Sequence, residues 1–223
     1  MQIGILGGTG PAGSGLAARL ASAGISTVVG SRAEDRAREA CAALAERWPD
    51  RDLPLEGRDN AGAAEADLVI VATPWDSAAA TAASVAKQLD GKVVVSMANA
   101  LVRLGDEFVA LALPRGSVAA HVQAAVPGAL VAAAFHHLPA RSLARLDEPL
   151  EGDVLVCSDH PAAWKATAAL VEQMVALRPL NAGSLSGAAA VEAMTVVLLQ
   201  LNARYRARAG LRLTGIRAGD RPG

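Results

Sequence analysis

The chain alternates between short, unbroken apolar runs and longer segments in which apolar residues recur at helical spacing. A strand that is buried on both faces has apolar side chains at nearly every position, so we predict strands in the apolar runs. The predicted strands are residues 3–6, 27–29, 68–72, 92–96, 130–135 and 153–157. The predicted helices are residues 16–20, 34–46, 60–66, 77–89, 106–113, 118–126, 160–177 and 188–209. This alternation is typical of an α/β protein with a mainly parallel sheet covered by helices on both faces.

The first predicted strand turns into the first predicted helix through one glycine-rich segment, Gly8-Thr9-Gly10-Pro11-Ala12-Gly13. This is the spacing of a dinucleotide-binding turn. We expect Gly8 to permit the tight turn, Gly10 to let the backbone approach a pyrophosphate, and Gly13 to let helix and strand pack closely. The helix N-terminus would offer N–H groups and the positive end of its dipole to the phosphates. The sequence therefore predicts a Rossmann-type, doubly wound fold.

The end of the second predicted strand indicates which dinucleotide is bound. An NAD enzyme usually has Asp or Glu there, which accepts a hydrogen bond from the ribose 2′-hydroxyl. This strand instead ends in Gly30-Ser31-Arg32, and Arg36 follows one turn into the next helix. A hydroxyl and two guanidinium groups would hold a 2′-phosphate through charge-assisted hydrogen bonds. We predict that these groups select NADP; the alternative is that Ser31 caps the helix and the arginines are solvated surface.

Composition narrows the classes of function. The chain is 52% hydrophobic but only 3% aromatic, so its core must be built mainly from Ala, Val and Leu. A formal net charge of −1 argues against nucleic-acid binding. The two cysteines, Cys41 and Cys157, are far apart and form no metal-binding motif, as is common in reduced, cytoplasmic proteins. We also expect no membrane segment, since no run approaches roughly twenty apolar residues.

The pattern of strands and helices changes near residues 140–149, where we place a domain boundary. Residues 1–145 would form the dinucleotide-binding domain. Residues 146–216 would form a smaller C-terminal α/β domain that covers the cleft at the ends of the strands. Residues 217–223 are expected to be a disordered tail.

Seven short blocks, spread from residue 1 to about residue 216, carry a family resemblance. They are Leu6-Gly7-Gly8-Thr9-Gly10, Val28-Val29-Gly30-Ser31-Arg32, Pro74-Trp75, Phe135-His136-His137-Leu138-Pro139-Ala140, Leu146-Asp147-Glu148, Arg178-Pro179-Leu180 and Val191-Glu192-Ala193-Met194-Thr195. Together they resemble the F420:NADP oxidoreductases, which reduce the deazaflavin coenzyme F420 with NADPH. Pyrroline-carboxylate reductases and 6-phosphogluconate dehydrogenases share the first block but not the set. The resemblance implies a homodimeric enzyme that transfers a hydride reversibly between NADP(H) and F420.

The resemblance also implies roles for residues around NADP. Residues 9–12 would line the pyrophosphate. Thr73 and Asn99, which follow two core strands, would flank the ribose and the nicotinamide. Ala140 would contact the nicotinamide amide through its backbone.

A second group of residues is implied for F420. Leu138 and Thr195 would border the deazaflavin ring, together with His136, which could donate a hydrogen bond or relay a proton. Two departures from the family pattern concern this coenzyme: His137 replaces a smaller residue, usually Thr, and residues 97–101 lack the family's prolines. Hydride transfer between two planar rings requires orientation rather than a nucleophile or a metal, and we predict no metal site.

Three other functions fit parts of the same sequence. The first is an NADPH-dependent reductase of a flavin or of ferric chelates that uses the same pocket. The second is a non-catalytic NADP-binding regulatory protein, although the loop of residues 136–140 and the apolar last helix argue against it. The third is an imine or hydroxyacid dehydrogenase, which would need a Lys or Asp as proton donor near the nicotinamide. None of the three lysines, Lys87, Lys92 and Lys165, follows a core strand.

Overall fold

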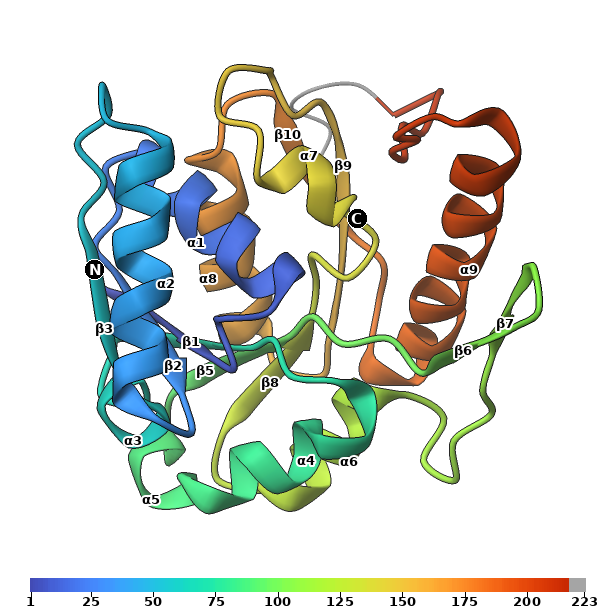
Figure 1. The fold of residues 1–223 in the computed structure, drawn as a ribbon. Coiled ribbons are helices and arrows are strands. Elements are labelled where there is room, and N and C mark those ends of the chain that lie inside the picture. The colour runs from blue at the N-terminus through green and yellow to red at the C-terminus, as the bar shows by residue number, and fades with distance from the viewer. Residues whose placement is uncertain (217–223) are drawn as a thin grey trace.

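The computed structural model describes residues 1–216 of the chain. An eight-stranded sheet forms its centre (Figure 1). The strand order is β10-β9-β8-β5-β4-β1-β2-β3. All neighbouring strands are parallel except β8 and β9, which are antiparallel. The strands are β1 (Ile3–Leu6), β2 (Thr27–Ser31), β3 (Leu55–Asp59), β4 (Leu68–Val71), β5 (Val93–Ser96), β8 (Leu130–Ala133), β9 (Gly152–Ser158) and β10 (Leu177–Asn181). The predicted Rossmann-type α/β fold is confirmed. The predicted tail, residues 217–223, lies outside the described residues.

Helices cover both faces of this sheet (Figure 1). On one face lie α1 (Pro11–Ser22), α2 (Glu34–Arg47), α7 (Ala140–Leu143) and α8 (Pro161–Glu172). On the other lie α3 (Asn60–Ala63), α4 (Trp75–Ser84), α5 (Ala86–Leu89), α6 (Val118–Ala125), and α9 (Ala188–Tyr205), which follows the 3-10 turn Leu185–Gly187. The two cores between these layers consist mainly of Ala, Val, Leu and Ile, as the composition predicts.

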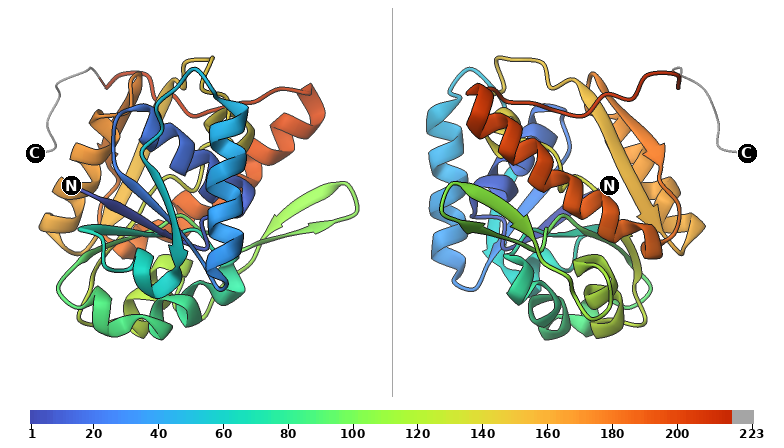
Figure 2. Two further views of the ribbon diagram at one scale, coloured as in Figure 1. Left: turned by 60° about the vertical axis from the view of Figure 1, so that its left-hand side comes forward. Right: turned by 90° about the vertical axis from the view of Figure 1, so that its right-hand side faces the viewer.

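Two elements differ from the sequence-based prediction. The strand β3 was not predicted, because it is a polar edge strand in which only Gly57 is buried. The helix predicted at 106–113 is wrong: this region forms a hairpin of β6 (Leu101–Leu104) and β7 (Glu107–Ala110). Gly105 turns the chain between them with a left-handed φ of 59°. The hairpin projects from the body of the molecule beside α9 (Figure 2).

The last helix is long and strongly apolar, as the sequence indicates. Within residues 1–216, one segment, Leu185–Tyr205, is long and apolar enough to cross a membrane by length and composition, with 21 residues and a hydropathy of 1.4. The expectation that no segment approaches this length is therefore wrong. The helix owes its hydropathy to Ala, Val and Leu, and it places Glu192 and Thr195 on its buried side.

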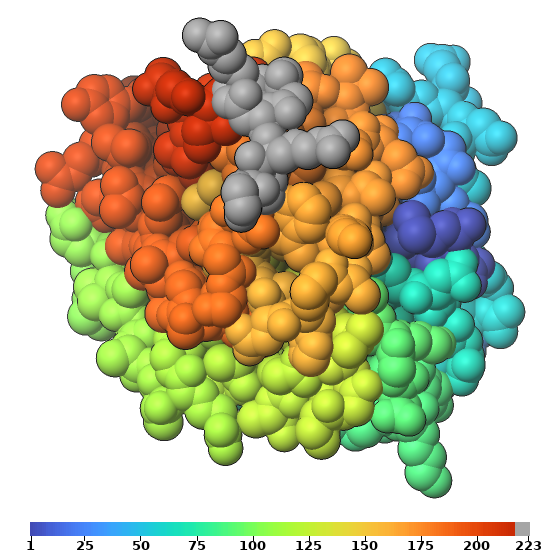
Figure 3. Space-filling view, turned by 180° about the vertical axis from the view of Figure 1, so that it is seen from behind, coloured from blue at the N-terminus to red at the C-terminus, as the bar shows by residue number. Residues whose placement is uncertain are grey.

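After α9 the chain returns to the sheet and binds to β9. The carboxylate of Asp153, which is 0% exposed, accepts a hydrogen bond from the backbone N–H of Leu213 at 2.7 Å. The Arg178 guanidinium of β10 forms a two-pronged ion pair with the same carboxylate, with both N···O distances 2.8 Å. Burial alone would raise the pKa of Asp153, but Arg178 and this N–H hold it below its usual value. Seen from behind, the orange surface of β9, β10 and α8 lies between the red C-terminal part of the chain and the blue N-terminal part (Figure 3).

Candidate functional site

The glycine-rich segment forms the turn from β1 into α1, and each of its glycines has a different structural role. The left-handed conformation falls on Gly7, with φ of 68°, one residue before the predicted position. A Cβ on Gly8 would lie 2.9 Å from the carbonyl oxygen of Ile5, and one on Gly13 would lie 2.9 Å from the Cα of Gly8. By contrast, a Cβ on Gly10 would meet only the carbonyl oxygen of Gly7, at 3.9 Å. Gly8 and Gly13 are thus required by packing, while Gly10 faces open space.

The N-terminus of α1 has no anion supplied by the protein. Its N-cap residue is Gly10, which has no side chain to accept a hydrogen bond, and Pro11 begins the helix. The first turn contains no acidic residue. This end of the helix is therefore open to a negatively charged ligand, as the sequence predicts for a pyrophosphate.

The arginines that follow β2 differ in whether they form an ion pair within the protein. Ser31 is buried and its hydroxyl accepts a hydrogen bond from Ala33 at 3.4 Å, but the N-cap of α2 is Ala33, so Ser31 does not cap this helix. Arg38 pairs with Glu34 across one helical turn. Arg32 and Arg36 are exposed and form no ion pair with another residue of 1–216. Their charges are therefore available to a ligand.

A small polar network joins three predicted site residues. The Asn99 amide donates to the backbone carbonyl of His136 at 2.8 Å. The Thr195 hydroxyl lies 3.0 Å from the Asn99 side-chain oxygen and 3.2 Å from the same carbonyl. The structure thus brings together residues from the segment after β5, the loop after β8, and α9. Thr73, in the loop after β4, packs its methyl group on Gly7, and its buried hydroxyl has no hydrogen-bond partner among the described residues.

The loop that contains His136 is strained and dry. Phe135 is fully buried and has a left-handed φ of 64°, which is unfavourable for a bulky side chain. Burial, and then the neighbouring His137, lower the pKa of His136 to about 3, so its imidazole is neutral at physiological pH. Neither ring nitrogen makes a regular hydrogen bond within the described residues, and the backbone at Ala134 and Val191 only partly offsets the desolvation. His137, by contrast, donates from Nε2 to the Asp153 carbonyl at 2.8 Å.

One residue that the sequence analysis did not single out is Glu192, on α9. Its side chain is buried, and its two oxygens accept hydrogen bonds from the backbone N–H groups of Val118 and Ala119 at 2.9 and 3.1 Å. These are the first residues of α6, whose N-cap Ser117 also accepts a hydrogen bond, from Ala120. Burial raises the pKa of Glu192 to about 7, although the two N–H groups oppose the shift. A carboxylate within the apolar first part of a helix was the signal that could have revealed it.

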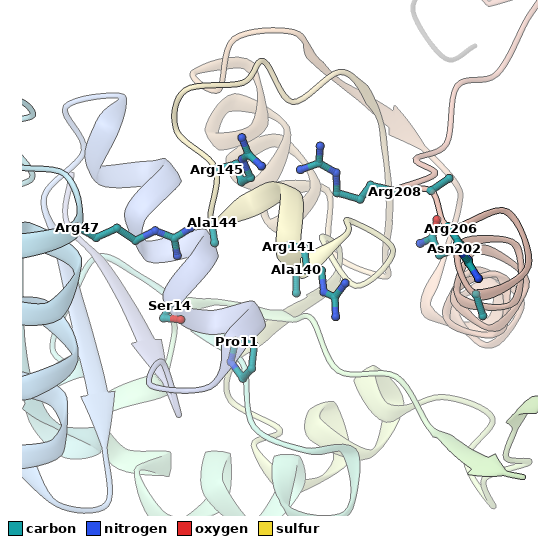
Figure 4. A pocket seen from close by; sticks show the side chains of 12 residues that line it. Pro11, Ser14, Arg47, Ala140, Arg141, Ala144, Arg145, Asn202, Arg206 and Arg208 are labelled. Atoms are coloured by element: carbon teal, nitrogen blue, oxygen red, sulfur yellow. The ribbon is translucent and has the colours of Figure 1, made fainter. Parts of the chain in front are cut away.

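A cavity of about 800 Å³ lies between α1, α7 and the end of α9 (Figure 4). Two residues predicted to contact NADP, Pro11 and Ala140, line it. Thr73, Asn99 and Thr195 do not. Its lining is rich in arginine, which the sequence analysis did not predict, because these arginines come from three separate segments. Within residues 1–216 there is no group of three or more His, Cys, Asp or Glu that could hold a metal ion.

Comparisons with known proteins agree on one family. A family model described as coenzyme F420-dependent NADP oxidoreductase matches residues 2–100. The F420-dependent NADP reductase of Methanothermobacter thermautotrophicus is 34% identical over 226 residues, covering 97% of this chain and 96% of that protein. The reductase of the same description from Methanocaldococcus jannaschii is 35% identical over 222 residues, covering 97% and 99%. The crystal structure of a proposed F420-dependent NADP reductase from Arthrobacter sp. FB24 has a TM-score of 0.78 and 25% identity, covering 95% of this chain and 98% of that one.

Proposed function

The chain belongs to the family of F420-dependent NADP reductases, and we propose that it binds NADP along the glycine turn and F420 against α9. It is an oxidoreductase whose coenzymes are NADP and F420. When both are bound, they supply the chemistry themselves by exchanging a hydride. The protein's own residues bind, orient and desolvate the two coenzymes.

The residues at the NADP end fit the predicted ligand. The open N-terminus of α1 would bind the pyrophosphate, and the space beside Gly10 would admit it. Arg32 and Arg36 would hold the 2′-phosphate, since no other residue of 1–216 neutralises them. The unpartnered hydroxyl of Thr73 would bind the nicotinamide ribose. This pairing of an uncapped helix end with two free guanidinium groups is the observation that carries the assignment.

The residues at the F420 end would form a firm wall. Thr195 shares its one hydroxyl proton between the Asn99 side-chain oxygen and the His136 carbonyl, and the Asn99 amide donates to the same carbonyl. Asn99, which is predicted to flank the nicotinamide, would thus hold this wall in shape where the two coenzymes meet. Leu138 adds an apolar side chain that is 8% exposed. A neutral His136 has one N–H to donate and one lone pair to accept, which suits a hydrogen-bonding role at the ring.

A direct assay tests the function. Purified protein mixed with NADPH and oxidised F420 should bleach the deazaflavin absorbance, while FMN or a ferric chelate in place of F420 should give much slower oxidation of NADPH. Equal rates with FMN would support a flavin reductase instead. Tight NADPH binding without any turnover would support a regulatory protein.

Arg32→Ala tests the choice of nucleotide. Loss of a charge-assisted hydrogen bond should weaken NADPH binding by about 1.5–3 kcal/mol and leave NADH binding nearly unchanged. Arg38→Ala, on the following helix α2, is the matched control, because Arg38 is already paired with Glu34. Equal losses for NADPH and NADH in Arg32→Ala would remove Arg32 from the 2′-phosphate site.

Thr195→Trp tests the F420 wall. The larger side chain should abolish F420 turnover while NADP binding persists, because Thr195 is predicted to border the deazaflavin ring and not the phosphates of NADP. Thr195→Val keeps the size and removes the hydroxyl, so it separates bulk from hydrogen bonding. Full turnover by a folded Thr195→Trp protein would exclude Thr195 from the site.

Further features of the whole protein belong to the same proposal. We expect a cytoplasmic homodimer, with the exposed Val197, Leu201 and Tyr205 of α9 at the interface. Analytical ultracentrifugation of wild type and Tyr205→Asp measures this. The division into residues 1–145 for NADP and residues 146–216 for covering F420 also remains a prediction, and β9 and β10 lie in the same sheet as the NADP-binding strands.

A further inference from the structure

The helix α7 lies against α1 at a position where α1 has no side chain. A Cβ on Gly15 would lie 3.0 Å from the Cβ of Leu143 and 3.2 Å from the carbonyl oxygen of Ala140. These neighbouring atoms would have to move by a few tenths of an ångström to admit it. Leu143 is fully buried in the core on this face of the sheet. Gly15 therefore sets the closest approach of the two helices.

One turn further along α1, Arg19 binds the chain that leaves α7. Its guanidinium donates hydrogen bonds to the backbone carbonyls of Ser142 at 2.7 Å, Arg145 at 2.6 Å and Glu148 at 3.0 Å. The first of these residues belongs to α7, and the other two belong to the segment that follows it. A guanidinium can hold three acceptors at once because its N–H groups form a fixed fork. Arg19 thus fixes the end of α7 and the following segment to α1.

The charge of Arg19 has no counter-ion in this position. Within residues 1–216 it forms no ion pair, and its buried Nε has no hydrogen-bond partner. Burial, and then the charge of Arg51, lower the pKa of Arg19, and Asp147 offsets only part of this effect. Desolvation of an unpaired charge opposes folding, so stability alone does not explain an arginine here. The three carbonyl contacts point instead to a role in geometry.

The docking of α7 fixes one end of a loop in the proposed site. Residues 134–139 run from β8, which is held in the sheet, to α7. They include His136 and Leu138 of the proposed F420 wall, and Ala140, which begins α7, is predicted to contact the nicotinamide. The helix α7 has only four residues, and a single turn does not hold its position by itself. Its contacts with α1 therefore determine where the second end of the loop lies.

The same helix connects this loop to the proposed pyrophosphate site. Pro11, Gly15 and Arg19 are spaced four residues apart, so they lie along one face of α1. The N-terminal end of that face is the uncapped end proposed for the pyrophosphate, and the rest of the face carries α7. One helix thus sets the position of the loop relative to the phosphates of NADP.

We propose that Gly15 and Arg19 are positioning residues for hydride transfer, which act through α7 by fixing the loop at which the two rings would meet. Neither residue is assigned a contact with a coenzyme. A misplacement of about 1 Å far from the reacting atoms can slow a reaction by about 100-fold, whereas binding is spread over many contacts. The inference rests on the proposed function, because it concerns the rate at which the two bound coenzymes react.

Arg19→Met tests the contacts with the three carbonyls. Methionine keeps an unbranched side chain that favours a helix and removes every N–H donor. Single-turnover reduction of F420 by NADPH, and by NADPH deuterated at the transferred position, measures hydride transfer at saturation. The rate constant should fall at least tenfold with a fully expressed isotope effect, while the Kd of NADPH and of F420 should change less than threefold. Arg19→Lys keeps the charge and some N–H donors and should restore part of the rate.

Gly15→Ala tests the helix contact without any change of charge. Alanine favours a helix more than glycine does, which offsets the crowding against α7 and preserves the fold. The transfer rate should fall at least threefold, again with little change in either Kd. Arg51→Met is the matched control, because Arg51 donates to the Leu146 carbonyl at 2.8 Å, in the segment after α7 but not on α7. It should lower the thermal midpoint and leave the transfer rate unchanged.

The outcomes separate this inference from the proposed function. Wild-type protein that transfers no hydride from NADPH to F420 would refute the proposed function. Wild-type transfer together with unchanged rates in folded Arg19→Met and Gly15→Ala would refute only the inference. Equal slowing by Arg51→Met, or a loss confined to the Kd of NADPH, would also overturn it. Thermal unfolding identifies a variant that does not fold, and if Arg19→Met is one, Gly15→Ala decides.

Discussion

Two helices of this protein begin in opposite ways. At α6, Ser117 and the Glu192 carboxylate together accept hydrogen bonds from three of the first backbone N–H groups. At α1, the N-cap is Gly10 and no side chain caps the helix. Both ends carry the same partial positive charge. One is neutralised by a carboxylate from the protein's own chain, and the other remains open for a ligand.

The N-terminus of α6 serves to hold the structure together, whereas the N-terminus of α1 is left for ligand binding. Glu192 holds α9 on α6, and Thr195, one turn later on α9, then lies against Asn99 and His136. The filled helix end therefore positions the wall of one coenzyme site, while the open end forms part of the other. Four substitutions can break or sharpen this contrast, in order of decreasing effect.

The largest effect is expected from the titration of Glu192, whose pKa is raised from 4.5 to about 7. A carboxyl group with a raised pKa binds more protons in the folded state, so the stability it contributes is present below pH 4.5 and is lost as the pH rises through 7. This group alone should lower the free energy of unfolding by about 2–3 kcal/mol between pH 5 and pH 8. Glu192→Gln removes the titration, and urea denaturation of both proteins at the two pH values measures the difference.

The comparison with Glu192→Gln also removes an opposing effect. Burial lowers the pKa of His136 to about 3 and lowers that of His137, so their contributions to stability are lost as the pH falls below 6.5. These contributions are common to wild type and variant and cancel in the difference. An equal pH dependence of the two proteins would show that Glu192 does not titrate in this range.

The second largest effect on stability is expected at α1, the helix whose N-terminus is open. Gly13→Ala would place a Cβ 2.9 Å from the Gly8 backbone and 3.1 Å from the Ala72 side chain. We expect the free energy of unfolding to fall by about 1–3 kcal/mol, since α1 must move away from the turn. Thermal unfolding without ligand measures this, and an unchanged midpoint would mean that the turn yields without strain.

Gly10→Ala separates binding from packing at the same turn. The new methyl group meets no atom closer than 3.9 Å, and Gly10 has an ordinary φ of −74°, so stability should be unchanged. The methyl group would occupy the space proposed for the pyrophosphate, and NADPH should bind about tenfold more weakly, a change of about 1.4 kcal/mol. Unaltered affinity in this variant would place the pyrophosphate elsewhere.

The smallest effect on stability is expected at the N-terminus of α6. Ser117→Ala removes one of the acceptors at the start of α6 and should lower the free energy of unfolding by about 1 kcal/mol. The affinity for NADPH should not change, because α6 does not contribute to the proposed NADP site. A matching loss of NADPH affinity would show that the two helix ends are coupled.

The sequence predicted the elements whose side chains are all buried and missed those at the edges. Residues 3–6 and 68–72 form central strands, and their unbroken apolar runs reflect burial on both faces. The strand β3 lies at the sheet edge and keeps a polar sequence, with Gly57 buried close to the backbone of Arg38. For residues 106–113, apolar spacing suggested a helix, whereas the Gly105-Asp106 pair was the better indicator of a hairpin turn.

In the site, the sequence predicted features that depend on neighbouring residues and missed those that depend on distant contacts. The glycine turn and the Ser31-Arg32 end of β2 could be predicted, because their chemistry depends on neighbouring residues in the chain. The partner of Glu192 could not, since Val118 and Ala119 are 74 and 73 positions away. The arginines that line the cavity come likewise from three separate segments, and only folding brings them together.

The return of the chain to β9 sets a practical limit on trimming its C-terminus. Deleting the segment that contains Leu213 would remove an N–H donor from the inaccessible Asp153 carboxylate, and with it two carbonyl acceptors of Arg178, on Leu213 and Ile216. The remaining ion pair would then lose part of its hydrogen-bonding shell, a loss that is severe where water cannot substitute. An affinity tag at this end should therefore be appended after the native sequence rather than replace its last dozen residues.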